Sequence, residues 1–270
     1  MNHSSSDPEI DEAVAGRPGG SVADRVVIVT GAARGLGRDY ARMFAAEGAA
    51  VVLADLDQPA VEDAVKAISA EVPNARLTPV ATDVTDPAQT EAMAAAALDS
   101  YGRIDVLINN AGIWGDLEPA PAVETAPDYW DLVMAVNLRG PLLCAQAVVG
   151  AMRKARWGRI INISSMGAYM PAGVYGVSKL GLNQLTFALA TELGASGITV
   201  NAVAPGPIDN EATRSQVPPK GIQKMIDGTA VGRMGTAADL FGMIRFLATE
   251  EAGWITGQTF GVNGGFSSRL

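Results

Sequence analysis

The chain has 270 residues, 48 % of them hydrophobic, which is enough for one large α/β domain or two small ones. Its net charge of −9 argues against nucleic acid and anionic membrane surfaces as main partners. Cys144 is the only cysteine and His3 the only histidine, which excludes an intrachain disulfide, a Ser-His-Asp hydrolase and a histidine-ligated metal site. Acid–base chemistry must therefore use tyrosine, lysine or carboxylates. We expect no metal, and a reducing, cytoplasmic compartment.

Residues 1–21 are polar and rich in glycine, serine and proline, which predicts a disordered tail ahead of a domain over 22–270. The segment lacks the basic and apolar regions of a signal peptide. No apolar run reaches the length of about 18 residues that a membrane span needs. We therefore expect no membrane as a partner.

Residues 26–30 form a β-branched run that predicts a buried parallel strand. A glycine-rich stretch over 30–37 follows, and then a helix over 38–47. Strand, glycine turn and helix together can bind a pyrophosphate through backbone N–H groups and the helix dipole. The spacing is Gly-x-x-x-Gly-x-Gly, and such a turn by itself can be only a tight corner.

A second strand is predicted over 49–54, and Asp55 follows it, 24 residues after Gly31. A carboxylate at this place can bind the adenosine ribose hydroxyls and would repel a 2′-phosphate, which favours NAD over NADP. Arg34 is a signal in the opposite direction, because a cation in the turn could meet a 2′-phosphate. We give Asp55 the greater weight and expect NAD.

Strands and helices keep alternating along the rest of the chain, which predicts a single-domain, doubly wound parallel sheet with helices on both faces. The segment about 208–232 is expected to form a substrate lid. The further predicted strands cover residues 76–82, 104–108, 159–163, 198–203 and 258–262, and the helices cover 59–70, 87–100, 127–152, 175–193 and about 236–248.

The stretch 162–179 carries the residues with chemical potential. Ser164 and Ser165 follow a predicted strand, and Tyr175 and Lys179 lie four residues apart on one helix face. A cation beside a phenol lowers the pKa of the phenol, so the tyrosine can exchange a proton with an alcohol oxygen while a serine stabilises the developing charge. A Tyr-x-x-x-Lys pair alone is usually an ordinary surface pair, so this interpretation depends on the upstream motifs.

Together these motifs resemble the short-chain dehydrogenase/reductase family over nearly the whole chain. The resemblance implies a Rossmann-type fold, a nicotinamide cofactor, a homotetramer, and the catalytic set Asn137, Ser165, Tyr175 and Lys179. The residues that carry it are Thr30-Gly-Ala-Ala-Arg-Gly-Leu-Gly37, Asn109-Asn-Ala-Gly112, Asn137, Ser164-Ser165, Tyr175-Gly-Val-Ser-Lys179, Pro205-Gly206 and Ile255-Thr-Gly-Gln258.

The resemblance and the sequence neighbours of the catalytic set also imply which residues line the site. The expected cofactor contacts are Gly31, Arg34, Gly35, Leu36, Gly37, Asp55, Leu56, Asp83, Val84, Asn110, Ala111, Gly112, Tyr175, Lys179, Pro205, Gly206 and Ile208. The expected substrate pocket consists of Trp114, Ser165, Met166, Met170 and Tyr175.

Three positions depart from the usual pattern of the family. Ser165 and Tyr175 are only ten residues apart, which makes the loop between them short and leaves Ser164 a contender for the catalytic serine. Asn210 stands where the family often has threonine, which puts one nicotinamide contact in doubt. Asn263 replaces an aspartate, and we attach no functional meaning to it.

The sequence therefore predicts reversible hydride transfer between NAD(H) and a secondary alcohol or ketone, hydrophobic or alicyclic in type. One alternative is an NADPH-dependent carbonyl or 3-oxoacyl-carrier-protein reductase, for which the basic cluster 153–159 could dock an acidic carrier. Arg214, Lys220 and Lys224 leave an anionic substrate open. A second alternative is a dinucleotide-binding sensor without catalysis.

Overall fold

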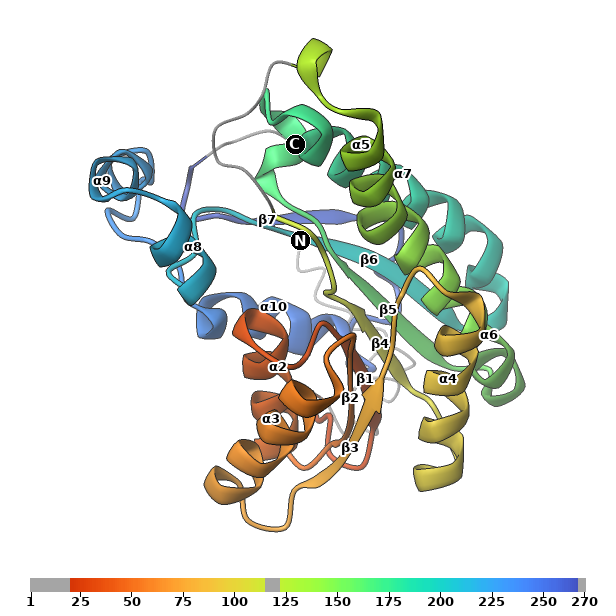
Figure 1. Ribbon diagram of the computed structural model, residues 1–270. Coiled ribbons are helices and arrows are strands. Elements are labelled where there is room, and N and C mark those ends of the chain that lie inside the picture. The colour runs from red at the N-terminus through yellow and green to blue at the C-terminus, as the bar shows by residue number, and fades with distance from the viewer. Residues whose placement is uncertain (1–19, 115–121, 267–270) are drawn as a thin grey trace, which may run out of the picture.

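The computed structural model describes residues 20–114 and 122–266, so nearly all of the predicted N-terminal tail lies outside the described residues. Within them, seven parallel strands form one sheet in the order β3-β2-β1-β4-β5-β6-β7 (Figure 1). This confirms the predicted doubly wound, Rossmann-type sheet. The strands are β1 Val26–Thr30, β2 Ala50–Asp55, β3 Arg76–Ala81, β4 Val106–Asn109, β5 Gly158–Ile163, β6 Ile198–Pro205 and β7 Thr259–Val262.

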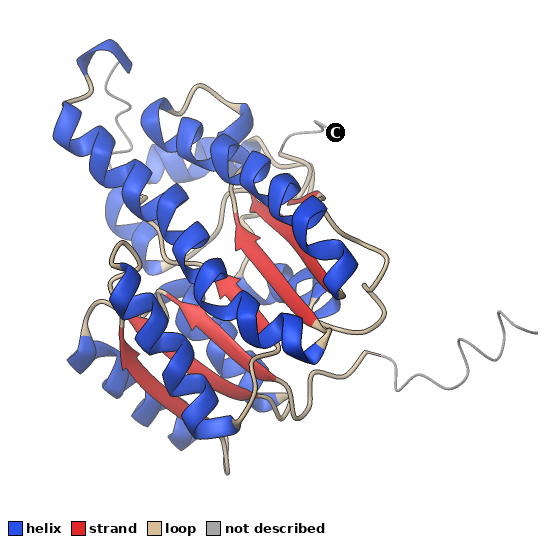
Figure 2. Ribbon diagram, turned by 90° about the vertical axis from the view of Figure 1, so that its right-hand side faces the viewer, coloured by secondary structure: helices blue, strands red, loops and turns tan. Residues whose placement is uncertain are grey.

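Helices cover both faces of the sheet, and Figure 2 shows some of them crossing in front of the strands. Every residue of β1, β5 and β6 is buried, as expected for apolar strands covered on both sides. One face packs against α2 Gly35–Ala46, α3 Gln58–Glu71 and α10 Ala237–Leu247. The other packs against α4 Pro87–Tyr101, α6 Gly140–Ala155 and α7 Gly173–Leu193.

Two boundaries differ from the predictions in ways that matter for the site. Helix α2 begins at Gly35, inside the glycine-rich turn, so the turn supplies the first helical residues. The long helix expected over 127–152 is α5 Pro127–Met134, a π-helical turn η2 Ala135–Arg139, and then α6. The predicted lid segment contains α8 Glu211–Gln216 and α9 Pro219–Asp227.

The continuous helical segment Pro127–Ala155 is long and apolar enough to cross a membrane by length and composition alone. No apolar run of this length was expected from the sequence. Its apolar residues have another role here, because Cys144, Val148 and Met152 belong to the core beneath one face of the sheet. One such segment is weak evidence for a span, because the core helix of a soluble protein passes the same test; here 39 % of the apolar window is buried.

The order of the strands creates a crevice at the carboxyl edge of the sheet. Strand β1 pairs with β2 on one side and with β4 on the other. The chain winds outward from β1 to β3 and then returns to β4, so the segments after β1 and β4 lead away in opposite directions. In open α/β sheets such a switch point is where ligands bind.

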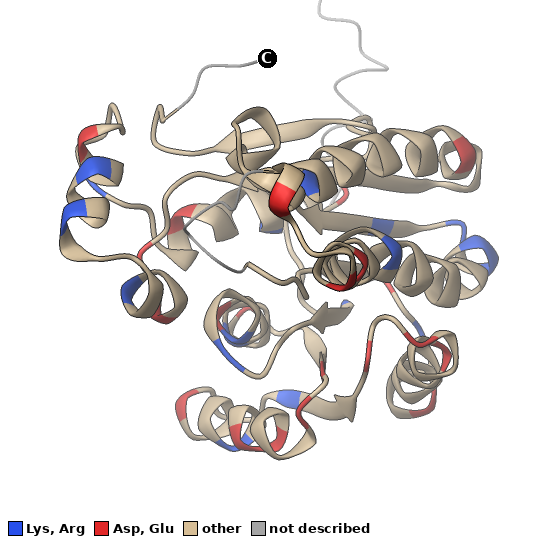
Figure 3. Cartoon of the chain, turned by 45° about the horizontal axis from the view of Figure 1, so that its top comes forward, with Lys and Arg blue, Asp and Glu red and all other residues tan. Residues whose placement is uncertain are grey.

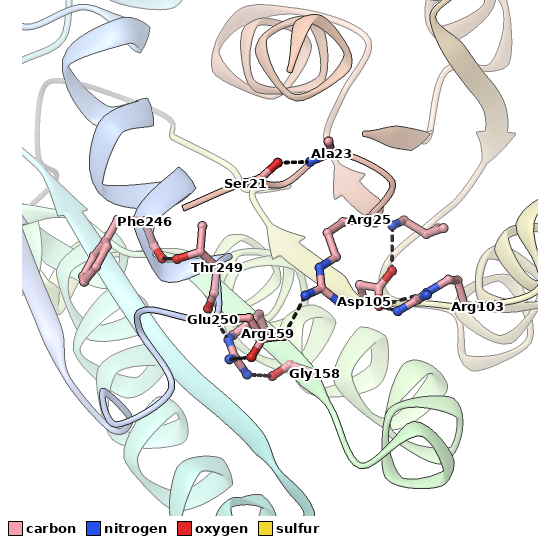
Figure 4. Close-up of polar contacts among 11 residues, drawn as sticks. Ser21, Ala23, Arg25, Arg103, Asp105, Gly158, Arg159, Phe246, Thr249 and Glu250 are labelled. Carbon is pink, nitrogen blue, oxygen red and sulfur yellow. Dashed lines mark hydrogen bonds and ion pairs between the residues drawn. The ribbon is translucent and has the colours of Figure 1, made fainter. Parts of the chain in front are cut away.

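The amino edge of the sheet is held by a polar network (Figure 4). Asp105 is buried, and it accepts the Val26 N–H at 2.8 Å and the Arg103 Nη2 at 2.6 Å. Arg25 bonds Glu250 at 2.7 Å and lies 3.9 Å from the centre of the Trp157 ring. The network joins the starts of β1 and β5 to the end of α10.

Part of the predicted basic cluster 153–159 belongs to this network. Arg159 is 3 % exposed, donates to the Thr249 carbonyl at 3.0 Å, and lies 4.4 Å from the Trp157 ring centre. Burial lowers the pKa of Arg159 to about 10. The cluster ends where β5 begins, and Ser165 follows the far end of that strand, about 20 Å away.

Candidate active site

The glycine-rich turn after β1 fits a pyrophosphate. Gly31 and Gly35 have φ angles of +65° and +56°, which favour glycine. A Cβ on Gly37 would lie 2.0 Å from the Gly31 carbonyl oxygen, so no side chain fits there. Within the described residues, the side chain of the N-cap residue Arg34 makes no capping hydrogen bond to the first turn of α2. That turn also contains no acidic residue. The turn therefore leaves helix N–H groups for an anion.

The segment after β4 is tied directly to this turn. Asn110 donates through Nδ2 to the Thr30 carbonyl at 2.9 Å and to the Gly31 carbonyl at 3.2 Å. The Thr30 hydroxyl accepts the N–H groups of Asn110 and Ala111, both at 3.0 Å. The Asn110 side chain, predicted to line the dinucleotide, is thus engaged in shaping the turn.

Asp55 lies at the last position of β2, beside the same turn. Its Oδ2 accepts the Ala33 N–H at 2.9 Å, and its Oδ1 accepts the Asp57 N–H at 3.2 Å. The carboxylate therefore holds the turn, while its remaining lone pairs can accept ribose hydroxyls. Leu56 is 72 % exposed, and Arg34 is exposed without an ion pair within the described residues.

Other predicted cofactor contacts lie at the carboxyl ends of β3 and β6. The Asp83 carboxylate accepts the N–H and the hydroxyl of Thr85, at 2.8 and 2.7 Å, while Val84 is buried. Ile208 is also buried and pairs with Gly235 of a short bridge. Of the other predicted contacts, Pro205 is buried at the end of β6, whereas Leu36 in the turn, Ala111 after β4 and Gly206 after β6 are partly buried.

Lys179 reaches from α7 to the end of β5. Its Nζ donates to the Ile163 carbonyl at 2.8 Å, and the side chain is nearly fully buried. Ser164 donates to the Lys179 carbonyl at 3.4 Å and is itself 3 % exposed. A Cβ built on Gly112 would lie 3.5 Å from Nζ, so the loop after β4 runs close to the lysine.

Ser165 and Tyr175 meet across the short loop between them. Ser165 accepts the Gly167 N–H at 2.9 Å, which starts a 3-10 turn, η3 Met166–Tyr169. A Cβ built on Gly167 would lie 3.0 Å from Tyr175 Cε1 and 3.2 Å from Ser165 Oγ. Because Ser164 is turned towards the Lys179 backbone, Ser165 is the serine that lies beside the tyrosine.

The pKa of Tyr175 differs from the expectation that Lys179 lowers it. Burial raises the pKa of Tyr175, and the hydrogen bond with Ser165 offsets only part of that rise. The Lys179 Nζ lies 5.8 Å from the centre of the tyrosine ring. Burial also lowers the pKa of Lys179, to about 8. The reason is that desolvation penalises the charged form of both groups.

Asn137 sits in the π-helical turn, fully buried. Its Oδ1 accepts the Ile113 N–H at 2.7 Å, and its Nδ2 donates to the Ile113 carbonyl at 2.9 Å and to Ser178 Oγ at 3.2 Å. The place of a Cβ on Gly112 is 3.3 Å from Oδ1 and 3.5 Å from Lys179 Nζ. Asn137 and Lys179 therefore flank one point of the loop after β4.

The predicted pocket residues differ in exposure. Met166 is 3 % exposed, and its sulfur packs near Gly261 of β7, whereas Met170 is 45 % exposed and Trp114 is partly buried. Asn210 caps α8 by accepting the Thr213 N–H at 2.8 Å, which gives this departure from the family pattern a structural role.

A cleft of about 720 Å³ lies against the predicted lid. It combines apolar side chains with two Arg–Asp pairs, and Figure 3 shows acidic and basic positions together on this part of the chain. Arg214 bonds Asp209 at 2.6 Å, and Arg233 bonds Asp239 at 2.8 Å. The lining residues are Asp209, Arg214, Ile222, Ile226, Arg233, Met234, Thr236 and Asp239.

Comparison with known proteins agrees with this geometry. The family described as Enoyl-(Acyl carrier protein) reductase matches residues 31–267. An uncharacterized oxidoreductase of Mycobacterium tuberculosis is 44 % identical over 241 residues, which cover 89 % of this chain and 96 % of the relative. The chain belongs to the short-chain dehydrogenase/reductase family. This confirms the resemblance stated above.

Two further similarities come from named members of the short-chain dehydrogenase/reductase family. The 3-oxoacyl-acyl-carrier-protein reductase of Thermotoga maritima is 38 % identical over 244 residues, covering 89 % of this chain and 97 % of that protein. The solved structure of a levodione reductase is similar with a TM-score of 0.85 and 33 % identity, covering 90 % of this chain and 97 % of that chain. The family uses a nicotinamide dinucleotide, and the glycine turn fits one.

Three residues that shape the site had no role assigned from the sequence, although Thr30 and Ser178 belong to the motifs named above. Ser178 and Ile113 bind Asn137, and Thr30 binds the segment after β4. These bonds join residues between 24 and 80 positions apart, so no local pattern predicts them. Ser178 could be noticed in the sequence because it stands next to Lys179, but its hydrogen-bond partner Asn137 could not be read from that position.

The buried amine of Lys179 should make the stability of the protein depend on pH. Its pKa is about 8 when folded against 10.5 when exposed, so between these values the unfolded state binds more protons and stability rises with pH. The rise amounts to about 3 kcal/mol, and the cost of burial is fully present below pH 8. We expect the free energy of unfolding, measured with urea, to rise by this amount over this pH range in the wild type and not to show this rise in Lys179→Met.

A matched control is Lys154→Met, which removes an exposed lysine at the end of α6. Its free energy of unfolding should follow the wild type in parallel across the same pH range. A Lys179→Met curve that is also parallel to the wild type would contradict the assigned burial effect.

Proposed function

We propose that this chain is an NAD-dependent oxidoreductase that transfers hydride between NAD(H) and a secondary alcohol or ketone. The observation that supports the proposal best is the meeting of Ser165, Tyr175 and Lys179 at the carboxyl edge of the sheet, next to a glycine turn that fits a pyrophosphate. A surface Tyr-x-x-x-Lys pair would not bury its lysine in this way.

The proposed chemistry divides between cofactor and protein. A bound nicotinamide would supply the hydride chemistry. Tyr175 exchanges a proton with the substrate oxygen, and its raised pKa suits donation during reduction. Ser165 donates a hydrogen bond to the same oxygen. Lys179, with a pKa of about 8, can pass protons near neutral pH, with Asn137 beside it.

We further propose a hydrophobic or alicyclic substrate. Support comes from the apolar side chains around the short loop and on the lid, among them Met170, Ile222 and Ile226. An anionic substrate is less favoured, because Arg214 already pairs with Asp209. The remaining lid cations, Lys220 and Lys224, lie on the exposed side of α9.

Replacing Tyr175 by phenylalanine tests the catalytic role. We expect Tyr175→Phe to lower kcat by about 10²- to 10⁴-fold on cyclic and aryl secondary alcohols, because the proton donor is lost. Binding of NADH, followed by fluorescence, should stay close to the wild type. A variant that keeps full activity would overturn the mechanism, and a wild type that binds dinucleotide without oxidising any alcohol would favour the sensor alternative.

We propose NAD as the cofactor rather than NADP. The support is Asp55, whose carboxylate is held beside the glycine turn by the Ala33 N–H. Arg34 is exposed and would be the group to favour a 2′-phosphate. The carboxylate repels that phosphate from a fixed position, whereas the exposed arginine must be ordered to attract it.

Titration with NADH and NADPH at one salt concentration tests this preference. We expect the wild type to bind NADH at least about tenfold more tightly, which corresponds to about 1.4 kcal/mol. Asp55→Asn keeps an oxygen for the Ala33 N–H but removes the charge, so it should lose most of the preference, while Arg34→Ala should retain it. Tighter binding of NADPH that disappears in Arg34→Ala would reverse the assignment.

A second candidate is an NADPH-dependent carbonyl or 3-oxoacyl-carrier-protein reductase. It is favoured by the similarity to the Thermotoga maritima reductase and by the description of the matching family. The position of the basic cluster 153–159 argues against carrier docking there, because the cluster ends in the first residues of β5 while the catalytic groups follow the far end of that strand. The same titration separates the two candidates.

We also propose a homotetramer in a cytoplasmic compartment. The neighbouring helices α5 and α7 expose Leu132, Val177, Leu180 and Phe187, each at 48–57 %. An apolar face of this kind suits a second copy. Cys144 is buried, and burial raises the pKa of its thiol to about 12, so it suits a packed, reduced side chain.

We expect sedimentation as a tetramer and a smaller species for Leu180→Glu; a monomeric wild type would contradict this.

A further inference from the structure

Ser178 connects Asn137 to α7, the helix that carries Tyr175 and Lys179 and is called the catalytic helix below. Both residues are fully buried, and Asn137 Nδ2 donates to Ser178 Oγ at 3.2 Å. The Ser178 hydroxyl in turn donates to the Tyr175 carbonyl at 2.8 Å. A hydroxyl has a single proton, so Ser178 can only accept from Asn137. The two hydrogen bonds therefore run in one direction, from Asn137 to Ser178 and from Ser178 to the Tyr175 carbonyl.

The other end of this connection is the loop after β4. The Asn137 amide binds both backbone groups of Ile113, at 2.7 and 2.9 Å. Ile113 follows Gly112, which belongs to the segment that is tied to the glycine turn through Asn110. A continuous path of hydrogen bonds thus leads from this loop to the catalytic helix.

Removing the Ser178 hydroxyl would break this path at a sensitive point. Both protons of the Asn137 amide are used, so one would lose its partner inside the protein. A Cβ built on Gly112 would lie 3.3 Å from the Oδ1 of the same amide and 3.5 Å from Lys179 Nζ, so the amide and the lysine lie on either side of this glycine. A π-helical turn is a frequent feature of functional sites, and here it presents this amide.

We propose that Ser178 is a positioning residue that couples the loop 110–114 to Tyr175 and Lys179. The dinucleotide-facing loop and the proton-transfer groups are then held in one arrangement through Asn137. The inference rests on the proposed function, because it requires a dinucleotide at that loop.

The chain contains a matched control on the same helix. Thr186 donates to the Leu182 carbonyl at 2.8 Å and accepts from Asn162 Nδ2 at 2.8 Å, and it is also fully buried. Thr186→Ala therefore removes an equivalent pair of bonds to Ser178→Ala, but its partner Asn162 binds Asn109 within β4 and not the Asn137 amide. A merely structural role would affect both variants alike.

The first experiment measures NADH and NADPH dissociation constants and melting temperatures for the wild type and both alanine variants. We expect similar losses of melting temperature, but a dissociation constant of the preferred dinucleotide raised about tenfold only in Ser178→Ala. Equal dissociation constants in the two variants would overturn the inference. A wild type that binds neither dinucleotide would instead overturn the proposed function.

A double-mutant cycle tests the path itself. Because Ser178 acts through Asn137, adding Ser178→Ala to Asn137→Ala should raise the dissociation constant by less than about twofold further. Fully additive effects would contradict coupling through the amide.

Hydrogen exchange on the wild type gives an answer even if Ser178→Ala does not fold. Adding the preferred dinucleotide should slow exchange at Ile113 and in the turn 175–179 together. Protection of the loop alone would overturn the inference.

Discussion

The site depends on the contact between the segments that follow β1 and β4. Thr30 and Asn110 exchange hydrogen bonds of 2.9–3.0 Å across the point where the winding of the sheet reverses. These bonds satisfy backbone groups of a turn that has to stay open for a ligand. They also hold the loop after β4 beside the glycine turn, which brings Gly112 within reach of Lys179.

The burial of Lys179 is the second constraint, and it links packing to chemistry. The side chain of Lys179 reaches from α7 to the Ile163 carbonyl, and the Ser164 hydroxyl donates to the backbone carbonyl of Lys179. Desolvation lowers its pKa to about 8 and raises that of Tyr175. A neutral phenol next to a readily deprotonated amine is a suitable pair for moving a proton to an alcohol oxygen.

Charge is placed differently at the two edges of the sheet. At the amino edge, Asp105, Arg25, Arg159 and Glu250 pair with one another and hold strand starts together. At the carboxyl edge, the Asp55 carboxylate binds backbone N–H groups and keeps acceptor capacity. In the first arrangement the charges are used on one another, whereas the second leaves acceptor groups for a ligand.

The sequence by itself determined the parallel sheet and pointed to the residues proposed for the site, because apolar runs, glycine spacing and the Tyr175–Lys179 interval are local patterns. Tertiary structure alone decided the pKa directions, since these follow from burial, and it places Ser165, the serine expected from the sequence, beside Tyr175 while Ser164 binds the Lys179 carbonyl. It also decided the bonds of Asn137 to Ile113 and Ser178, which lie 24 and 41 residues away. Such contacts depend on how distant segments pack, and no local pattern encodes them.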